Sequence, residues 1–314
     1  MDPTAMTPPA TRIDRFKLFL ALSRTPHGVL DMATPAFAVL LWLGGFPPLK
    51  IVLLGMITAF SGYTAVYALN DAIDLKPDKE RMRHDTSGGG RGYLDAVIVR
   101  HPLAQGLLSM KEAVAWVIGW ASVAMVGAYL LNPVCLVIFT AGTLLEIVYC
   151  LMWNVSPYRS IVSGFVKSTG GIAAVFAVDP DPSPVFLAAL FLSIFFWEIG
   201  GQNVPADWTD IDIDARLNAR TIPVRFGTRI SARLVVACLS SAVLFTIITI
   251  IVSRLPSGPL WAVCAAPAGI YLLVLPAKDL YKTDVRENAM VLFNRASYYP
   301  PAVLAIAVAA IIAA

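Results

Sequence analysis

Long apolar runs separated by polar connections fill most of this chain. We place nine runs close to the roughly 20 residues that a helix needs to cross a membrane, at 28–46, 50–69, 113–131, 134–152, 160–178, 184–202, 233–253, 259–276 and 298–314. Backbone in lipid must satisfy its own hydrogen bonds, so such runs predict helices. The pattern therefore predicts an all-α fold, a polytopic membrane helical bundle of about nine transmembrane helices.

Composition supports this class. The chain is 57% hydrophobic and only 14% charged, which is typical of a polytopic membrane protein and not of a soluble domain. Residues 1–12, rich in Pro, Thr and Ala, are expected to form a flexible N-terminal segment, with 13–314 as a single transmembrane domain. The four cysteines lie in or beside apolar runs without a CxxC pair, which favours core packing over a disulfide or a metal site.

Lysine and arginine are unevenly divided among the connections. With the N-terminus inside, the outer connections keep only Lys50 and Arg254, and the inner ones hold nearly all the rest. The positive-inside rule then predicts a cytoplasmic N-terminus and a C-terminus outside, in the inner membrane if the cell is bacterial. The net charge of +3 reflects this topology and gives no reason to expect a nucleic-acid partner.

One acidic pattern, DxxDxxxD, occurs twice, each time after an apolar run that ends on the predicted cytoplasmic side. On a helix this spacing places three carboxylates on one face. We expect Pro77 to end the first helix before the last carboxylate of its copy, so the one-face argument is firmer for the second copy. The two copies comprise Asp71, Asp74 and Asp78, and Asp207, Asp210 and Asp214.

Carboxylates this close repel one another, and chains tolerate such clusters mainly when a hard divalent cation holds them together. Mg²⁺ prefers a few carboxylates together with phosphate oxygens and water. We therefore expect all six aspartates to bind Mg²⁺, which would in turn hold a diphosphate. The alternative is that they belong to ordinary solvated loops at a membrane surface.

Basic residues surround both acidic motifs. Arg81, Arg83 and Arg91 follow the first, and Arg220 follows the second. Arginine suits bidentate contact with phosphate, although each of these residues could equally lie on a solvated surface. The glycine-rich segment 87–92 is expected to act as a lid that closes over a diphosphate and excludes water, with Arg91 as its phosphate contact.

Ionisable residues also occur inside the predicted spans. Glu146, Lys167 and Glu198 each lie within an apolar run, where burial in hydrocarbon costs about 2.5–3.5 kcal/mol on insertion scales. Such residues usually face a bundle interior or a cavity. The alternative is an interhelical ion pair that serves packing alone, for example between Glu146 and Lys167.

The motifs resemble those of the UbiA superfamily of intramembrane prenyltransferases, in which nine transmembrane helices surround a central cavity. Residues 70–78, beginning Asn70-Asp71, match the first family motif NDxxDxxxD in full, and 210–214 match the second, DxxxD. The similarity spans nearly the whole chain. It implies a membrane enzyme with a central cavity.

Further segments add to the resemblance, with departures. Arg24-Thr25-Pro26 is similar to an Arg-Pro signature at the first helix, and 220–227 to a basic, Ser/Thr-rich stretch. Residues 101–109 resemble an RPL-x-SG-x-x-S segment, from which His101 and Gln105 depart. Asn203 aligns where ubiquinone-type members often carry Asp.

The resemblance implies Mg²⁺-dependent transfer of a prenyl group from an isoprenyl diphosphate to an acceptor, expected to be aromatic, within the lipid bilayer. The alternatives are a membrane terpene cyclase of the same superfamily, which ionises the diphosphate without an acceptor, and a transporter, since acidic residues in spans can mark ion pathways. The implied catalytic residues are Asp71, Asp74, Asp210 and Asp214. The implied substrate-binding residues are Asn70, Arg24, Arg81, Arg83, Arg91, Lys167, Asn203 and Arg220.

Overall fold

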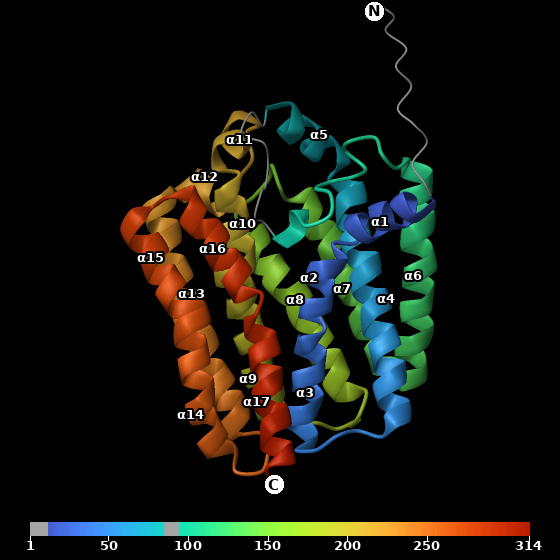
Figure 1. Cartoon of the computed structure of the whole chain (residues 1–314), viewed down its shortest axis with the longest axis vertical. Coiled ribbons are helices and arrows are strands. Elements are labelled where there is room, and N and C mark those ends of the chain that lie inside the picture. Colours follow the sequence, from blue (N-terminus) through green and yellow to red (C-terminus); the bar gives the residue numbers. More distant parts are fainter. Residues whose placement is uncertain (1–11, 85–93) are drawn as a thin grey trace, which may run out of the picture.

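A computed structural model describes residues 12–84 and 94–314, and within them all regular secondary structure is helical. Long helices run side by side along one axis, while short ones gather at one end (Figure 1). The elements are α1 Arg12–Leu22, α2 Thr25–Asp31, α3 Ala33–Leu43, α4 Leu49–Ile73, α5 Leu75–His84, η1 Leu94–Ala96, α6 Met110–Leu131, α7 Pro133–Leu151, α8 Arg159–Phe176, α9 Pro184–Trp197, η2 Glu198–Asn203, α10 Val204–Thr209, α11 Ile211–Arg216, α12 Ile222–Phe226, α13 Thr228–Ile251, α14 Gly258–Gly269, η3 Ile270–Val274, α15 Leu275–Thr283, α16 Arg286–Ala296 and α17 Tyr299–Ile312.

Eight helical stretches in the described residues are long and apolar enough to cross a membrane. They are 25–43, 49–73, 110–131, 133–151, 184–209, 228–251, 258–283 and 286–312. The remaining long helix, α8, packs against α3, α7 and α9. It is less apolar because it carries Arg159, Lys167 and several Ser and Gly residues. The prediction of an all-α membrane bundle of about nine helices is confirmed. The expected N-terminal segment lies almost wholly outside the described residues.

Close contact between helices depends on small residues, because lipid provides no hydrophobic drive for helix association. A side chain on Gly127 of α6 would place its Cβ 2.1 Å from the Thr58 hydroxyl oxygen of α4, so only glycine allows this approach. The fully buried core side chains include Leu41, Leu190, Leu239 and Leu292. They come from α3, α9, α13 and α16 and belong to one hydrophobic cluster that joins these helices.

Both acidic motifs lie where one helix ends and the next begins. Asp74 separates α4 from α5, and Asp210 separates α10 from α11. The first helix ends before Asp78, as Pro77 led us to expect, but its last residue is Ile73. Pro77 itself lies in the first turn of α5, where an N–H has no helical partner to lose. The expectation that the second copy shares one helix face is wrong. In both copies the middle aspartate stands at a corner between two helices.

Candidate active site

A cavity of about 500 Å³ lies within the bundle. The end of the cavity near the acidic motifs is polar and includes Arg24, Asn70 and Asp95. The rest is mostly apolar and reaches Phe46 in the α3–α4 connection and Val178 after α8, at the opposite end of the bundle (Figure 1). The cavity therefore has a long apolar wall and one charged end beside the acidic motifs, which we call its mouth. It is the central cavity that the sequence led us to expect.

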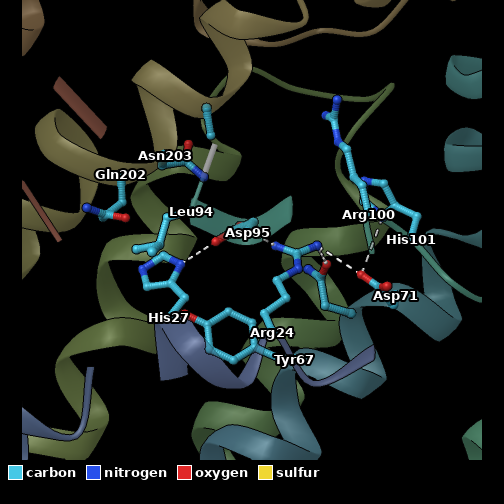
Figure 2. A network of polar contacts seen from close by, with 12 residues as sticks. Arg24, His27, Tyr67, Asp71, Leu94, Asp95, Arg100, His101, Gln202 and Asn203 are labelled. Carbon is cyan, nitrogen blue, oxygen red and sulfur yellow. Dashed lines mark hydrogen bonds and ion pairs between the residues drawn. The ribbon is translucent and has the colours of Figure 1, made fainter. Parts of the chain in front are cut away.

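The first acidic motif closes that mouth. Asp71 and Asp78 are each 2% exposed. Arg24 reaches the motif from the start of α2 and donates to Asp71 Oδ1 at 2.9 Å and to Asn70 Oδ1 at 3.1 Å (Figure 2). His101 Nδ1 lies 2.9 Å from Asp78 Oδ2 and 3.6 Å from Asp71 Oδ1. A cation and an imidazole thus meet the two buried carboxylates from different sides.

The second motif faces the first across α5. Arg81 contacts Asp214 Oδ1 at 2.9 Å and Asp78 Oδ1 at 3.3 Å, so one guanidinium bridges the two motifs. Arg100 donates to Asp210 Oδ2 at 2.7 Å. These groups surround a second, smaller pocket of about 230 Å³, which is lined by Arg81, Met82, Arg100, His101, Gln105, Asp210 and Ile213. Its basic side chains suit a phosphate group.

Burial and charge shift the pKa values at this end of the molecule. Burial, with repulsion from Asp78, raises the pKa of Asp74 to about 7. Burial also raises the pKa of Asp214 to about 7, although Arg81 opposes it. Burial alone would lower the pKa of His101, but the carboxylates of Asp78 and Asp71 raise it to about 9. Burial therefore disfavours the charged forms of Asp74 and Asp214, whereas the charged form of His101 is favoured by its two carboxylate neighbours.

The residues present fit a divalent cation. Ligand atoms of Asp71, Asp78 and His101 all lie within 4.8 Å of one another. The distances from His101 Nδ1 to the two carboxylates are close to the separation of about 3 Å between adjacent ligands of an ion bound at 2.0–2.1 Å. In the second motif, Oδ2 of Asp207 and Oδ2 of Asp214 are buried without a hydrogen-bond partner. Orphaned carboxylate oxygens of this kind are what a bound cation would satisfy.

Several residues of the site went unrecognised in the sequence. Asp95 Oδ1 lies 2.5 Å from His27 Nδ1, and its Oδ2 accepts from Arg24 Nη1 at 3.2 Å (Figure 2). Asp31 accepts from Lys167 Nζ at 2.5 Å and from the Tyr67 hydroxyl. Asp31 had a usable signal, because an ionisable residue inside an apolar run is the same signal that identified Lys167. His27 and Asp95 had none.

Arg159 is a further residue that the sequence did not single out. It is buried at the start of α8, where its Nη2 donates to the Tyr149 hydroxyl at 2.5 Å and lies 3.7 Å from Asp207 Oδ1. Its Nε and Nη1 have no hydrogen-bond partner. A buried guanidinium with free donors beside the second motif suits an anionic ligand.

The acidic residues inside the spans have different partners from those suggested. Glu146 accepts from Asn70 Nδ2 at 2.8 Å, whereas Lys167 contacts Asp31 and, at 4.0 Å, Glu198. The suggested Glu146–Lys167 pair is therefore wrong. All these groups except Asp31 line the cavity, as ionisable residues in spans commonly do.

The predicted phosphate contacts divide into two groups. Arg81 lies in the site, whereas Arg83 and Arg220 are exposed and line neither pocket. Arg220 instead donates to the Val155 carbonyl at 3.3 Å. Arg91 and the whole predicted lid lie outside the described residues.

A π-helical segment forms one wall of the cavity. η2 carries Glu198, Gln202 and Asn203, all of which line the cavity. Pro205, two residues further on, lacks the N–H that an α-helix would direct to the carbonyl four residues earlier. A wider π turn accommodates that loss and changes the direction of the side chains before it. Asn203, which donates to the Tyr149 hydroxyl at 2.8 Å, is presented in this way.

Comparison with known sequences locates the similarity over most of the chain. The model of the UbiA prenyltransferase family matches residues 32–298. A 4-hydroxybenzoate octaprenyltransferase of Shewanella pealeana is 26% identical over 217 residues, which are 68% of this chain and 70% of that protein. A digeranylgeranylglyceryl phosphate synthase of Thermococcus kodakarensis is 22% identical, over 77% of this chain and 78% of the relative.

Solved structures share the fold. A UbiA homolog from Archaeoglobus fulgidus, bound to DMAPP and Mg²⁺, superposes with a TM-score of 0.68 at 16% identity, covering 94% of this chain and 99% of its own. The apo structure of a UbiA homolog from Aeropyrum pernix K1 gives a TM-score of 0.65 at 19% identity, covering 96% and 98%.

Proposed function

This chain belongs to the UbiA prenyltransferase family, and from that premise we propose that it uses Mg²⁺ to transfer a prenyl group from an isoprenyl diphosphate to an acceptor in the central cavity. It is an integral membrane prenyltransferase. The observation that carries the proposal is the bridge from Asp78 through Arg81 to Asp214, which holds both acidic motifs over the mouth of an apolar cavity. The chemistry of that mouth suits a diphosphate, and the cavity suits an isoprenyl tail.

The charged residues would divide the binding of the diphosphate. Asp71, Asp74 and Asp78 in the first motif, and Asp207, Asp210 and Asp214 in the second, would hold the metal, with His101 beside the first three. When bound, Mg²⁺ neutralises charge on the diphosphate and so makes it a better leaving group. Arg81 and Arg100 would contact phosphate oxygens directly, since both line the smaller pocket. Lys167 and Asn203 would face the acceptor end of the substrates.

Transfer consists of ionisation of the isoprenyl diphosphate, bond formation with the acceptor and loss of a proton. The C–O bond to the diphosphate breaks, and the leaving group takes the electron pair. The aromatic faces of Tyr67 and Tyr149, which line the cavity, would stabilise the allylic cation that remains. The acceptor forms a bond to the cationic carbon and loses a proton. The apolar wall keeps water from competing with the acceptor.

The test is product analysis with purified protein, a panel of isoprenyl diphosphates and a panel of acceptors. We expect a prenylated acceptor and stoichiometric diphosphate, both abolished by EDTA and restored by Mg²⁺. Hydrocarbon formed from diphosphate alone would instead identify a terpene cyclase, and neither diphosphate release nor a product would leave the transporter alternative.

Matched variants test the acidic motifs. Asp71→Asn and Asp210→Asn should each lower kcat at least about 100-fold, on the scale of losing one stabilising group in a transition state. Asp212→Asn is the control, because Asp212 is exposed between two motif residues and should retain activity. Wild-type rates in Asp71→Asn or Asp210→Asn would refute the assignment.

A further inference from the structure

Charged groups of alternating sign form a series of contacts from the first motif along the cavity, and all of them except Asp71 and Asp31 line it. Starting from the first motif, Asp71 contacts Arg24, and Arg24 contacts Asp95 at 3.2 Å (Figure 2). Asp95 then meets His27 at 2.5 Å, and His27 Nε2 lies 3.7 Å from Asp31 Oδ1. Asp31 contacts Lys167, which lies 4.0 Å from Glu198 at the far end.

In this alternation the cations that line the cavity are already paired with carboxylates, and Arg159, whose Nε and Nη1 lack partners, does not line it. Among the described residues, the basic side chains that line the cavity are Arg24, His27 and Lys167, and each lies within salt-bridge distance of a carboxylate. Asp95, Glu146 and Glu198 line the same space. A carboxylate on the acceptor would therefore enter a site where like charges already line the wall, which disfavours the ionised form.

Two unsatisfied atoms of the same wall are hydrogen-bond acceptors, while a third, His27 Nε2, lies 3.7 Å from Asp31 Oδ1. Glu198 is buried, and its Oε1 accepts from Ser163 at 2.6 Å, but its Oε2 has no hydrogen-bond partner. Asn203 directs its Nδ2 to Tyr149 and leaves its Oδ1 equally unpaired and buried. A buried acceptor without a partner destabilises by about 1–3 kcal/mol, so a ligand that supplies donors at these two atoms would be favoured.

We infer that the acceptor is a neutral molecule whose hydroxyl groups donate to Glu198 and Asn203, and not a carboxylate such as 4-hydroxybenzoate. The inference rests on the proposed function and names its acceptor class. Glu198 and Asn203 both stand on η2, which Pro205 widens, so one local irregularity presents both hydrogen-bond acceptors to the cavity. Asp95, which lies beside Arg24 and His27, would repel a carboxylate in the same cavity.

The first test compares acceptors that differ only in charge. Each hydroxybenzoate or hydroxynaphthoate is paired with the corresponding hydroxymethyl and carboxamide compound, at fixed isoprenyl diphosphate and Mg²⁺. We expect kcat/KM for the neutral member to exceed that of the carboxylate by at least tenfold. Equal values, or a preference for the carboxylate, would overturn the inference.

The second test removes single carboxylates from the wall of the cavity. Glu198→Gln removes one of the two carboxylates beside Lys167, and Asp95→Asn removes the carboxylate between Arg24 and His27. Each variant should therefore raise kcat/KM for the carboxylate acceptor about tenfold relative to its neutral partner. Asp181→Asn, on an exposed connection at the other end of the bundle, is the control. Thermal melting in detergent confirms that each variant folds. Unchanged selectivity in both folded variants would refute the role of the wall.

Failure of the proposed function looks different. In that case no acceptor of either charge is prenylated and no diphosphate is released. Acceptor binding, measured by calorimetry with an unreactive thiolodiphosphate in place of the isoprenyl diphosphate, still reports the charge preference of the cavity. Tighter binding of the carboxylate member in that measurement would overturn the inference without any reference to turnover.

Discussion

Two residues of the site have backbone conformations that side chains other than glycine rarely adopt. Arg24 has φ 44° and His101 has φ 49°, in the left-handed region, which costs roughly 1–2 kcal/mol for such residues. Both side chains point at the carboxylates of the first motif. Strain at such positions is a common feature of functional sites, and here it coincides with contact to Asp71 and Asp78.

His101 offers the first prediction at this scale. Its Nδ1 has no aligned hydrogen-bond partner although it lies 2.9 Å from Asp78 Oδ2, so the two atoms converge as ligands of one ion would. His101→Asn preserves the left-handed backbone, which Asn tolerates, but removes the imidazole. We expect Mn²⁺ to bind about tenfold more weakly by calorimetry, with little change in Tm. A loss of the nitrogen coupling in pulsed EPR of bound Mn²⁺ would identify the ligand, whereas no coupling in the wild type would contradict it.

The raised pKa of Asp74 predicts an effect of pH on the free energy of unfolding. Its pKa, raised to about 7 from an ordinary value near 4, means that the folded metal-free protein holds this proton more tightly than the unfolded chain does. Stability from this group is therefore present below about pH 4 and is lost as the pH rises to 7. At pH 8, Asp74→Asn should stabilise the metal-free protein by roughly 1–3 kcal/mol, at about 1.4 kcal/mol for each pH unit of the shift.

The measurement is thermal melting in detergent with EDTA, from pH 5 to pH 8. The gain in Tm from Asp74→Asn should shrink toward pH 5 and should fall when Mg²⁺ is added, because the ion favours the charged carboxylate of the wild type. A gain that is independent of pH would contradict the argument.

The sequence located the centre of the site better than its surroundings. The Asp clusters follow from spacing alone, and Lys167 from its position in an apolar run. Arg81 and Arg83 look equivalent in sequence, but on a helix Arg81 stands one turn from Asp78 and Arg83 does not. Asp95, His27 and Arg159 come from segments far apart in the chain, so only the packing of α2, η1 and α8 reveals their contacts.

At the scale of elements, length and hydropathy predicted the spans because a helix in lipid needs a long apolar stretch. Irregularities within helices were harder to foresee. Neither the corners at Asp74 and Asp210 nor the two π segments have a hydropathy signal. Each π segment does precede a proline by two residues, Pro205 after η2 and Pro276 after η3, and this spacing is the signal that sequence reasoning could have used.

Pro205→Ala tests whether the π-helical segment η2 positions the acceptor site. Restoring the N–H permits an ordinary α-helical turn, which would rotate Glu198 and Asn203 away from their present positions in the cavity wall. We expect kcat/KM for the acceptor to fall at least tenfold, with Tm unchanged or raised. Pro276→Ala is the matched control, because η3 and its proline do not line the cavity. Equal activity in the two variants would show that the π turn has no part in presenting the acceptor site.

At the scale of the whole molecule, the charges define two ends. The acidic motifs, Arg81 and Arg100 gather with the short helices at one end of the bundle (Figure 1). At the other end, Arg254 is held over the Trp42 ring at 3.9 Å and lies 3.5 Å from Asp179, so its charge is partly neutralised. This asymmetry agrees with the positive-inside rule and predicts that the end with the motifs faces the cytoplasm.

Cysteine labelling from each side of the membrane tests that orientation. The exposed Cys264 and the three buried cysteines are first replaced. Single cysteines are then introduced at Asp212, between the second-motif residues, and at Asp181, in the α8–α9 connection, both of which are exposed. In intact cells an impermeant maleimide should modify Asp181→Cys alone, and Asp212→Cys should react only after the membrane is opened. The reverse pattern would place the acidic motifs outside the cell and would contradict the orientation predicted from the charge distribution.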